Sequence, residues 1–202
     1  MPRRKRPPRA LDIVPVTPER WRDLEALFSA KGCPGFCWCT PYRFRDAHTM
    51  DHARKRDALG GLVSASVPVG VLAVLAGVPV GWCSIAPRRT YEKLVRSRTM
   101  PVVDAEAWTL LCLFVRREHR GTGVARALVD GAVAYARSMG ADVVEAYPWD
   151  TAGRRKGATG PDPTMHFGHS ALYRAAGFAR EGATRRWVMP LRAGGAAGRT
   201  SA

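Results

Sequence analysis

Two glycines in a basic stretch offer the clearest opportunity for ligand chemistry in this sequence. Gly121 and Gly123 follow a group of arginines and directly precede an amphipathic segment. The first turn of a helix has backbone N–H groups without internal partners, and glycine lets a phosphate approach them closely. The nearby arginines, Arg116, Arg117 and Arg120, would add fixed positive charge. The spacing alone leaves two alternatives open, a phosphate-binding turn and an ordinary strand–helix connection.

Two common phosphate-binding motifs are excluded at these glycines. A Walker loop needs Lys-Ser or Lys-Thr after its last glycine, and neither pair follows Gly123. The dinucleotide fingerprint needs a third glycine, and Arg126 stands at that position.

The flanking segments would position this turn between a strand and a helix. Residues 108–115 form an uncharged run of strand length, which is typical of a buried strand. After the turn, apolar residues recur at intervals of three and four, and Gly140 stands where a glycine that ends a helix is expected. The recurring residues are Val124, Leu128, Ala132 and Tyr135.

Two motifs together resemble the GNAT acetyltransferases. The sequence from Arg120 to Ala125, RGTGVA, fits the acetyl-CoA loop of that family, [QR]-x-x-G-x-[GA]. SALYRAAGF, at residues 170–178, is similar to the family's "LY…GF" segment. Both motifs occur in the family's order and at about its separation.

The resemblance implies an α/β fold with one domain at residues 11–192. In the GNAT fold, a mixed, mostly antiparallel and twisted sheet of six to seven strands is flanked by helices and splays between its central strands. The basic residues 1–10 and the small-residue segment 193–202 are expected to be disordered tails.

The resemblance also implies acetyl-CoA as the cofactor. Its pantetheine arm would make sheet-like hydrogen bonds with the backbone of Leu113, Phe114 and Val115. Its diphosphate would lie on the turn formed by Arg120, Gly121, Thr122, Gly123, Val124 and Ala125.

Two residues are candidates for proton transfer in such an acetyltransferase. By resemblance, Tyr173 would donate a proton to the leaving thiolate; the alternative is that it only packs in the core. Glu145 is the best acidic candidate for the base, because it lies on the strand beside the expected gap. It could instead pair with an arginine, with a water relay taking the proton. Many relatives have a Glu where this chain has Leu111 and Cys112.

A loop rich in cysteine and aromatic residues follows the first expected helix. The spacing of Cys33, Cys37 and Cys39 matches no common structural zinc site, so no metal is expected. By its place in the GNAT fold, this loop would shape the acceptor pocket, or it would simply plug the core. The candidates for substrate contact are Trp38, Cys39, Trp82 and Tyr147. Many relatives have an asparagine in the region where Tyr147 stands.

The remaining segments are expected to form further helices, a hairpin and four more strands. We expect helices at 17–29 and 49–62, the second ending at Gly60-Gly61. Residues 59–87 contain no charge and are long enough to span a bilayer. Glycines and prolines interrupt them, however, which favours a hairpin of strands 69–75 and 78–85. Strands are also expected at 11–16, 142–147, 178–181 and 186–191, a short helix at 170–176, and a short helix or lid within 88–100.

The composition limits the choice of partners. The formal net charge is +15, which suits a polyanionic ligand such as coenzyme A, and five of the positive charges lie within residues 1–10. That tail has no aromatic residue for stacking on bases, so any contact with nucleic acid is expected to be weak. The odd number of cysteines and the lack of an apolar leader predict reduced thiols in a cytoplasmic protein. No membrane partner is expected, and a homodimer is left open.

Direct acetyl transfer from acetyl-CoA to an amine is the leading functional hypothesis. A small-molecule acceptor is favoured over a protein because aromatic residues crowd the expected pocket. The alternatives are a protein N-acetyltransferase and a non-catalytic GNAT-like domain that binds CoA as a sensor.

Overall fold

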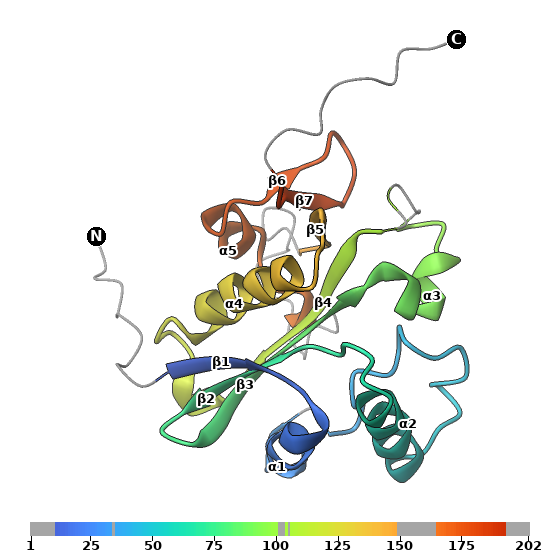
Figure 1. The fold of residues 1–202 in the computed structure, drawn as a ribbon, viewed down its shortest axis with the longest axis vertical. Helices are drawn as coiled ribbons and strands as arrows, with labels where there is room; N and C mark the ends of the chain where they lie inside the picture. Colours follow the sequence, from blue (N-terminus) through green and yellow to red (C-terminus); the bar gives the residue numbers. More distant parts are fainter. Residues whose placement is uncertain (1–10, 34, 101–103, 105, 149–164, 193–202) are drawn as a thin grey trace, which may run out of the picture.

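A seven-stranded sheet forms the centre of the molecule (Figure 1). The computed structural model describes residues 11–33, 35–100, 104, 106–148 and 165–192. The strand order is β1-β2-β3-β4-β5-β7-β6, and every neighbouring pair is antiparallel except β4 and β5. The strands are β1 Leu11–Pro15, β2 Val71–Leu75, β3 Val78–Pro87, β4 Trp108–Val115, β5 Val143–Ala146, β6 Ala179–Arg180 and β7 Trp187–Pro190. The predicted fold class and number of strands are confirmed.

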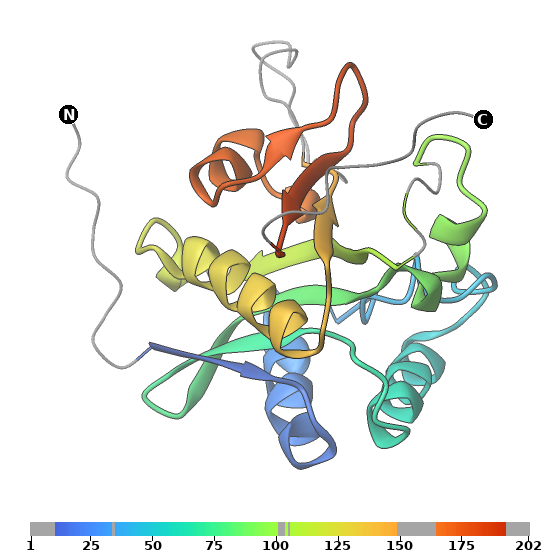
Figure 2. The same cartoon turned by 45° about the horizontal axis from the view of Figure 1, so that its top comes forward.

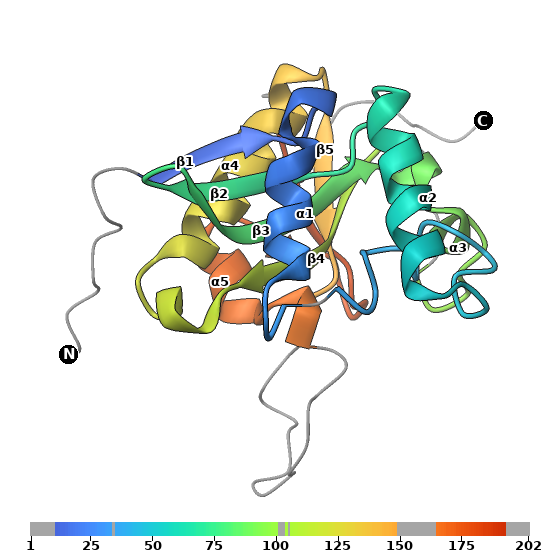
Figure 3. The same cartoon turned by 90° about the horizontal axis from the view of Figure 1, so that it is seen from below.

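Helices cover both faces of this sheet. They are α1 Trp21–Ser29, α2 His52–Ser64, α3 Glu92–Val95, α4 Val124–Ser138 and α5 Ser170–Ala175. Figure 2 shows α4 lying across the strands on one face, and Figure 3 shows α1 in front of the opposite face. The apolar stripe of α4 packs on β1 to β4, whereas α1 and α2 enclose a second core with Trp82. Four short 3-10 turns are also described: η1 Pro18–Arg20, η2 Arg88–Thr90, η3 Arg117–His119 and η5 Met165–Phe167.

The sheet opens between β4 and β5. β4 pairs with β3 over its whole length, but it pairs with β5 only from Trp108 to Leu110. Residues 111–115 therefore lie outside the β5 ladder. This register produces the splay that was expected between the central strands.

A β-bulge lies where this opening begins. Leu110 pairs with Ile85 and Cys112 pairs with Ser84, so Leu111 is an extra residue in β4. A bulge changes which face of the sheet the following side chains occupy. Trp108 and Leu110 pack with α4 before the bulge, and Leu113 and Val115 do so after it. Cys112 instead packs against the core that contains Trp82, and Leu111 packs in a third cluster with Tyr91.

The end of α2 differs from the prediction. Asp51 begins the helix by accepting a 2.8 Å hydrogen bond from the Arg54 amide, as a capping residue should. The helix then continues through Gly60 and Gly61 to Ser64. A Cβ on Gly60 would lie 3.2 Å from Cζ2 of Trp21. Gly60 therefore allows α2 to pack closely against Trp21, and the predicted stop at Gly60-Gly61 is wrong.

The other segments agree with the predictions in type, and the ends of the strands shift by at most two residues. The helix expected at 17–29 opens as the 3-10 turn η1 before α1. The uncharged stretch 59–87 contains the end of α2 and the β2–β3 hairpin, as predicted. In the part of the chain that the structure describes, no helix has the length and apolar character needed to cross a membrane. The two tails predicted to be disordered lie outside the described residues.

Candidate active site

The turn between β4 and α4 has the backbone conformation that its glycines predict. Gly121 has a φ of +73° and Gly123 has a φ of +95°, which is the left-handed region that favours glycine. A Cβ on Gly121 would meet no atom within 4 Å, so the outside of the turn is open. Gly123 is the N-cap of α4 and has no side chain that could cap the helix. The first-turn amides of α4 are therefore available to an anion.

The side chains of this turn brace it from within. Nε of Arg120 donates a 3.0 Å hydrogen bond to the carbonyl oxygen of Val115, and Oγ1 of Thr122 donates one of 2.7 Å to that of His119. The Val124 side chain is buried in the core below the turn. Val124 and Ala125 can therefore offer a ligand mainly their backbone N–H groups, and Arg120 and Thr122 have a structural role in addition to the predicted one.

The edge of β4 next to the turn is suited to an extended ligand. Phe114 packs on the α1 side of the sheet, while Leu113 and Val115 pack on the α4 side. All three residues lie beyond the last β4–β5 pair. A pantetheine arm laid along this edge could pair with their backbone groups as a strand would.

Tyr173 has a buried hydroxyl without a partner. The side chain lies on α5, is fully buried, and packs edge-on against Phe178 with 5.3 Å between ring centroids. Among the described residues, none forms a hydrogen bond with its OH group. Burial raises the pKa of Tyr173 well above its ordinary value, and the nearby Cys83 and Cys112 act in the same direction. The group is therefore a protonated donor at neutral pH.

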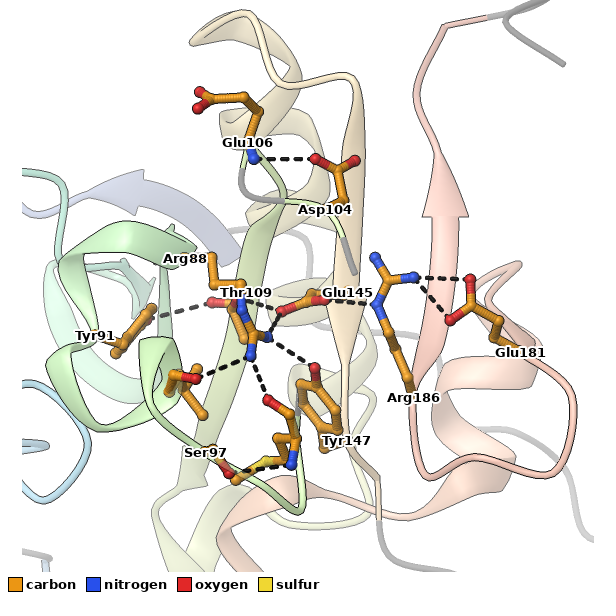
Figure 4. A network of polar contacts seen from close by, with 12 residues as sticks. Arg88, Tyr91, Ser97, Asp104, Glu106, Thr109, Glu145, Tyr147, Glu181 and Arg186 are labelled. Atoms are coloured by element: carbon orange, nitrogen blue, oxygen red, sulfur yellow. Dashed lines mark hydrogen bonds and ion pairs between the residues drawn. The ribbon is translucent and has the colours of Figure 1, made fainter. Parts of the chain in front are cut away.

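Glu145 lies in a buried ion cluster (Figure 4). One carboxylate oxygen accepts hydrogen bonds from Arg88 and from Oγ1 of Thr109, at 2.7 Å for the latter. The other oxygen is 2.6 Å from Nε of Arg186, whose Nη1 also contacts Glu181. Because Glu145 is 0% exposed and both oxygens are occupied, this geometry argues against the predicted role as general base. It is the arginine pairing that the sequence had left as an alternative.

Arg88 extends the ion cluster to neighbouring segments. Its Nη1 donates a 2.8 Å hydrogen bond to the Tyr147 hydroxyl, and its Nη2 donates one of 3.1 Å to the carbonyl of Leu94. Thr109 and Glu145 are opposite each other in the β4–β5 ladder. The cluster therefore holds β4 and β5 together just before they separate, and ties the α3 segment to them.

A cavity of about 480 Å³ lies beside the bulge of β4. Its walls come from the cysteine-rich loop, from β3 and β4, from the segment before α3 and from η5. The lining residues are Phe36, Cys37, Cys39, Pro41, Tyr42, Ser84, Tyr91, Leu111, Cys112, His166 and Phe167. The loop predicted to shape an acceptor pocket does line a cavity.

The cavity wall offers few groups that can exchange protons near neutral pH. No described Asp or Glu lines it. The Cys37 pKa is raised far above its ordinary value, first by hydrogen bonding with Cys39 and then by burial. Burial is also the main cause of the raised pKa of Tyr42, and it raises that of Tyr91 to about 12. Histidine is the side chain whose charge ordinarily changes near pH 7, which leaves His166 as the candidate base.

Of the four predicted substrate residues, only Cys39 lines the cavity. Trp38 is buried against Phe28 and donates a 3.1 Å hydrogen bond to Nε2 of His52. Trp82 is also in the core, and its Nε1 donates to Sγ of Cys39 at 2.9 Å. Tyr147 packs in the cluster that contains Tyr91 and Leu111, and its hydroxyl accepts a hydrogen bond from Arg88. We correct these three assignments, because the rings of Trp38, Trp82 and Tyr147 are buried in the packing and do not line the cavity.

Sequence reasoning missed several cavity residues. Phe36, Pro41 and Tyr42 belong to the loop that was singled out, so its composition was the available signal. Tyr91 and His166 come from distant segments, and no local pattern marks either of them. Among the described residues, no group of three or more His, Cys, Asp or Glu side chains could hold a metal ion.

The splayed sheet, the glycine turn and the helix that follows it define the acetyltransferase fold that the sequence resembles. A model of the acetyltransferase (GNAT) family matches residues 25–155, and the chain belongs to this family. No curated protein sequence matches the chain significantly.

The chain is similar to solved structures of the family. A GNAT-family protein from Desulfovibrio desulfuricans is 16% identical, with a TM-score of 0.50 over 91% of this chain and 100% of its own. YhbS from Escherichia coli, solved with CoA, is 18% identical, with a TM-score of 0.48 over 91% and 82%. A Brucella melitensis acetyltransferase, solved with acetyl-CoA, is 14% identical, with a TM-score of 0.47 over 91% and 89%. A Kribbella flavida GNAT is matched over only 32% of its own chain. The family membership supports acetyl-CoA as the cosubstrate, as the sequence predicted.

Proposed function

We propose that this protein transfers the acetyl group of acetyl-CoA directly to the amine of a small molecule. The observation that carries the proposal is the cavity beside Leu111 and Cys112, at the point where β4 separates from β5. The opening between the strands would receive the donor, and the cavity would receive the acceptor. The two substrates would meet at the bulge.

Donor binding would use the turn and the exposed edge of β4. The backbone amides at Gly123, Val124 and Ala125 would bind the diphosphate, supported by the helix dipole of α4. The backbone of residues 113–115 would hold the pantetheine arm. Nε of Arg116 is buried without a hydrogen-bond partner among the described residues, and its charge lies beside the turn. A basic chain with a net charge of +15 would attract this polyanion.

Direct attack by the amine is favoured over an acetyl-cysteine intermediate. An acetyl-enzyme would need a thiolate, but the Cys37 and Cys39 pKa values are both raised, so these thiols stay protonated near neutral pH. The amine nitrogen would attack the thioester carbonyl carbon, and the carbon–sulfur bond would break. His166 would take the proton that leaves the nitrogen, and Tyr173 would donate its proton to the departing thiolate.

Turnover with a panel of amines tests the proposal. The full chain would be incubated with acetyl-CoA and single amines, while release of free CoA and the acetylated product are both followed by mass spectrometry. We expect matched amounts of product and CoA with at least one small amine. A protein acceptor would be indicated if only peptides were acetylated.

Two observations favour a second candidate, a CoA-binding sensor. Tyr173 does not line the cavity, and neither does any described carboxylate. Calorimetry separates the two candidates: binding of CoA without acetylation of any amine would support the sensor, and turnover would exclude it.

A further inference from the structure

Arg43 carries a buried positive charge that no acidic residue of the described structure balances. Its side chain is 1% exposed, and among the described residues it forms no ion pair. Nε and Nη1 are buried without hydrogen-bond partners in the described structure. Among the described residues, two other arginines are buried, Arg88 and Arg186, and both contact Glu145. A buried charge without a counter-charge costs several kcal/mol in general, so a functional reason for its position is worth seeking.

This charge lies directly behind the wall of the cavity. Nη2 of Arg43 donates hydrogen bonds of 3.1 Å to Oγ of Ser84 and to the hydroxyl of Tyr91, and both residues line the cavity. The guanidinium also lies over the Tyr91 ring, 4.4 Å from its centroid. The cavity is lined mainly by apolar and aromatic side chains, where charges are screened less than in water. The positive charge of Arg43 therefore acts on whatever binds there.

A second cation acts on a residue of the cavity wall. Burial raises the pKa of the lining residue Tyr42, and the positive charge of the exposed Arg185 partly opposes that rise. The acid next to Tyr91 in sequence, Glu92, is engaged at the surface, where it accepts a 3.2 Å hydrogen bond from the Arg45 amide. A protonated amine would thus meet the positive charge of Arg43 behind the cavity wall and no described carboxylate in that wall.

We propose that the cavity selects an aromatic amine that is uncharged at neutral pH, and that Arg43 determines this specificity by excluding alkylammonium ions. The inference rests on the proposed acetyl transfer and names its acceptor class. A cavity of about 480 Å³ has the size and apolar lining of a site for a small aromatic molecule. Phe36, Tyr42 and Phe167 supply aromatic surface for the acceptor ring.

This acceptor class also suits the chemistry of the site. An aromatic amine carries a free electron pair at neutral pH, so no proton must be removed before it attacks. The nitrogen–carbon bond forms, the carbon–sulfur bond breaks, and one N–H proton leaves to His166. The thiolate takes a proton, so the products are a neutral amide and free CoA. An alkylammonium would first have to lose a proton in a cavity that offers no described carboxylate.

Aniline and benzylamine provide the matched test, because they differ by one methylene group, and near neutral pH the first is neutral while the second is protonated. For the wild-type chain we expect kcat/KM to be at least tenfold higher with aniline. Arg43→Met removes the charge but keeps the length, and should shift the ratio toward benzylamine by about tenfold, which corresponds to 1.4 kcal/mol. Arg43→Lys should keep the wild-type ratio. Arg45→Met, at an exposed arginine two residues away, is the control and should also keep it.

The wild-type ratio decides the outcome even if Arg43→Met does not fold. Equal or faster acetylation of benzylamine by the wild-type chain would overturn the inference and leave acetyl transfer intact. If a folded Arg43→Met variant kept the wild-type ratio, Arg43 would not determine the specificity, and that part of the inference would be overturned. If no amine of any kind is acetylated, the proposed function itself fails, and the inference fails with it.

Discussion

Nε of Arg186 lies 2.6 Å from Oε2 of Glu145, although the two residues are 41 positions apart in the sequence and both are buried. Arg88 contacts the other oxygen of the same carboxylate, and Glu181 contacts Arg186 (Figure 4). Two carboxylates thus balance two guanidinium groups at the base of the opening between β4 and β5. Glu145, which the sequence suggested as a base, is bonded to Thr109 of β4 and to both arginines, and so stabilises the base of the opening.

Glu145→Gln should therefore lower stability. The variant leaves two buried arginines around an uncharged amide, and breaking a buried pair in this way costs about 3–5 kcal/mol. Urea unfolding measures the change in the free energy of unfolding. Glu106→Gln is the matched control, because Glu106 pairs with Arg89 at the surface and its loss should cost less than about 1 kcal/mol. If Glu145→Gln were fully stable but inactive, Glu145 would have to be returned to the list of catalytic candidates.

Gly123→Glu should abolish binding of CoA. The left-handed φ of Gly123 strains any side chain, and a carboxylate at the N-terminus of α4 would repel the diphosphate. Gly140 supplies the control, because it has a φ of +83° at the other end of the same helix, where a Cβ would meet no atom within 4 Å. Gly140→Glu should have a similar strain of about 1–3 kcal/mol but should bind CoA normally. Calorimetry compares the two affinities. Equal affinity in both variants would move the diphosphate away from this turn.

The sequence was most informative where one local pattern determines the structure. The bounds of β4 were predicted correctly, and so was the end of α4. There the amide of Ala141 bonds the carbonyl of Ala136 and that of Gly140 bonds Arg137, which is the Schellman arrangement that a glycine favours. The glycine turn likewise follows from a short contiguous motif.

The cavity depends on contacts between distant segments, which the sequence did not reveal. His166 reaches it from η5, and Arg43 lies behind it against the usual tendency of arginine to stay exposed. Trp38 was expected at the pocket because it lies in the correct loop. It is instead turned into the core, with a φ of +45° that brings its ring against those of Trp21 and Phe28. Local composition identified the loop but not the direction of its side chains.

Tyr173→Phe should lower turnover without lowering stability. The hydroxyl has no hydrogen-bond partner among the described residues, so its removal leaves no polar group unsatisfied and should raise the free energy of unfolding by up to about 1 kcal/mol. If the hydroxyl protonates the thiolate, kcat should fall about 100-fold while the affinity for CoA stays unchanged. Tyr147→Phe is the contrasting variant, since its hydroxyl is bonded to Arg88 and its loss should cost about 1–3 kcal/mol. An unchanged kcat would leave Tyr173 as a packing residue.

The pH dependence gives a second check on Tyr173. Burial raises the pKa of Tyr173 in the folded state, because the charged form is disfavoured there. The folded state therefore loses no stability through this ionisation below the unfolded pKa of about 10, and it loses stability as the pH rises above that value. Tyr173→Phe should therefore lose stability less steeply than the wild type above about pH 10, as measured by thermal unfolding. Parallel curves for the two proteins would show that Tyr173 does not titrate differently in the folded state.

His166→Gln should lower turnover. His166 lines the cavity, where its imidazole is the candidate base among the described residues. As a general base it would contribute about 100-fold or more to kcat, and the variant should lose this contribution. His169→Gln is the matched control, because this exposed histidine lies three residues away and does not line the cavity. The variants would be compared at saturating acetyl-CoA, so that a lower affinity for the donor does not appear as a lower kcat. An unchanged kcat in His166→Gln would assign the base to another group or to a water relay.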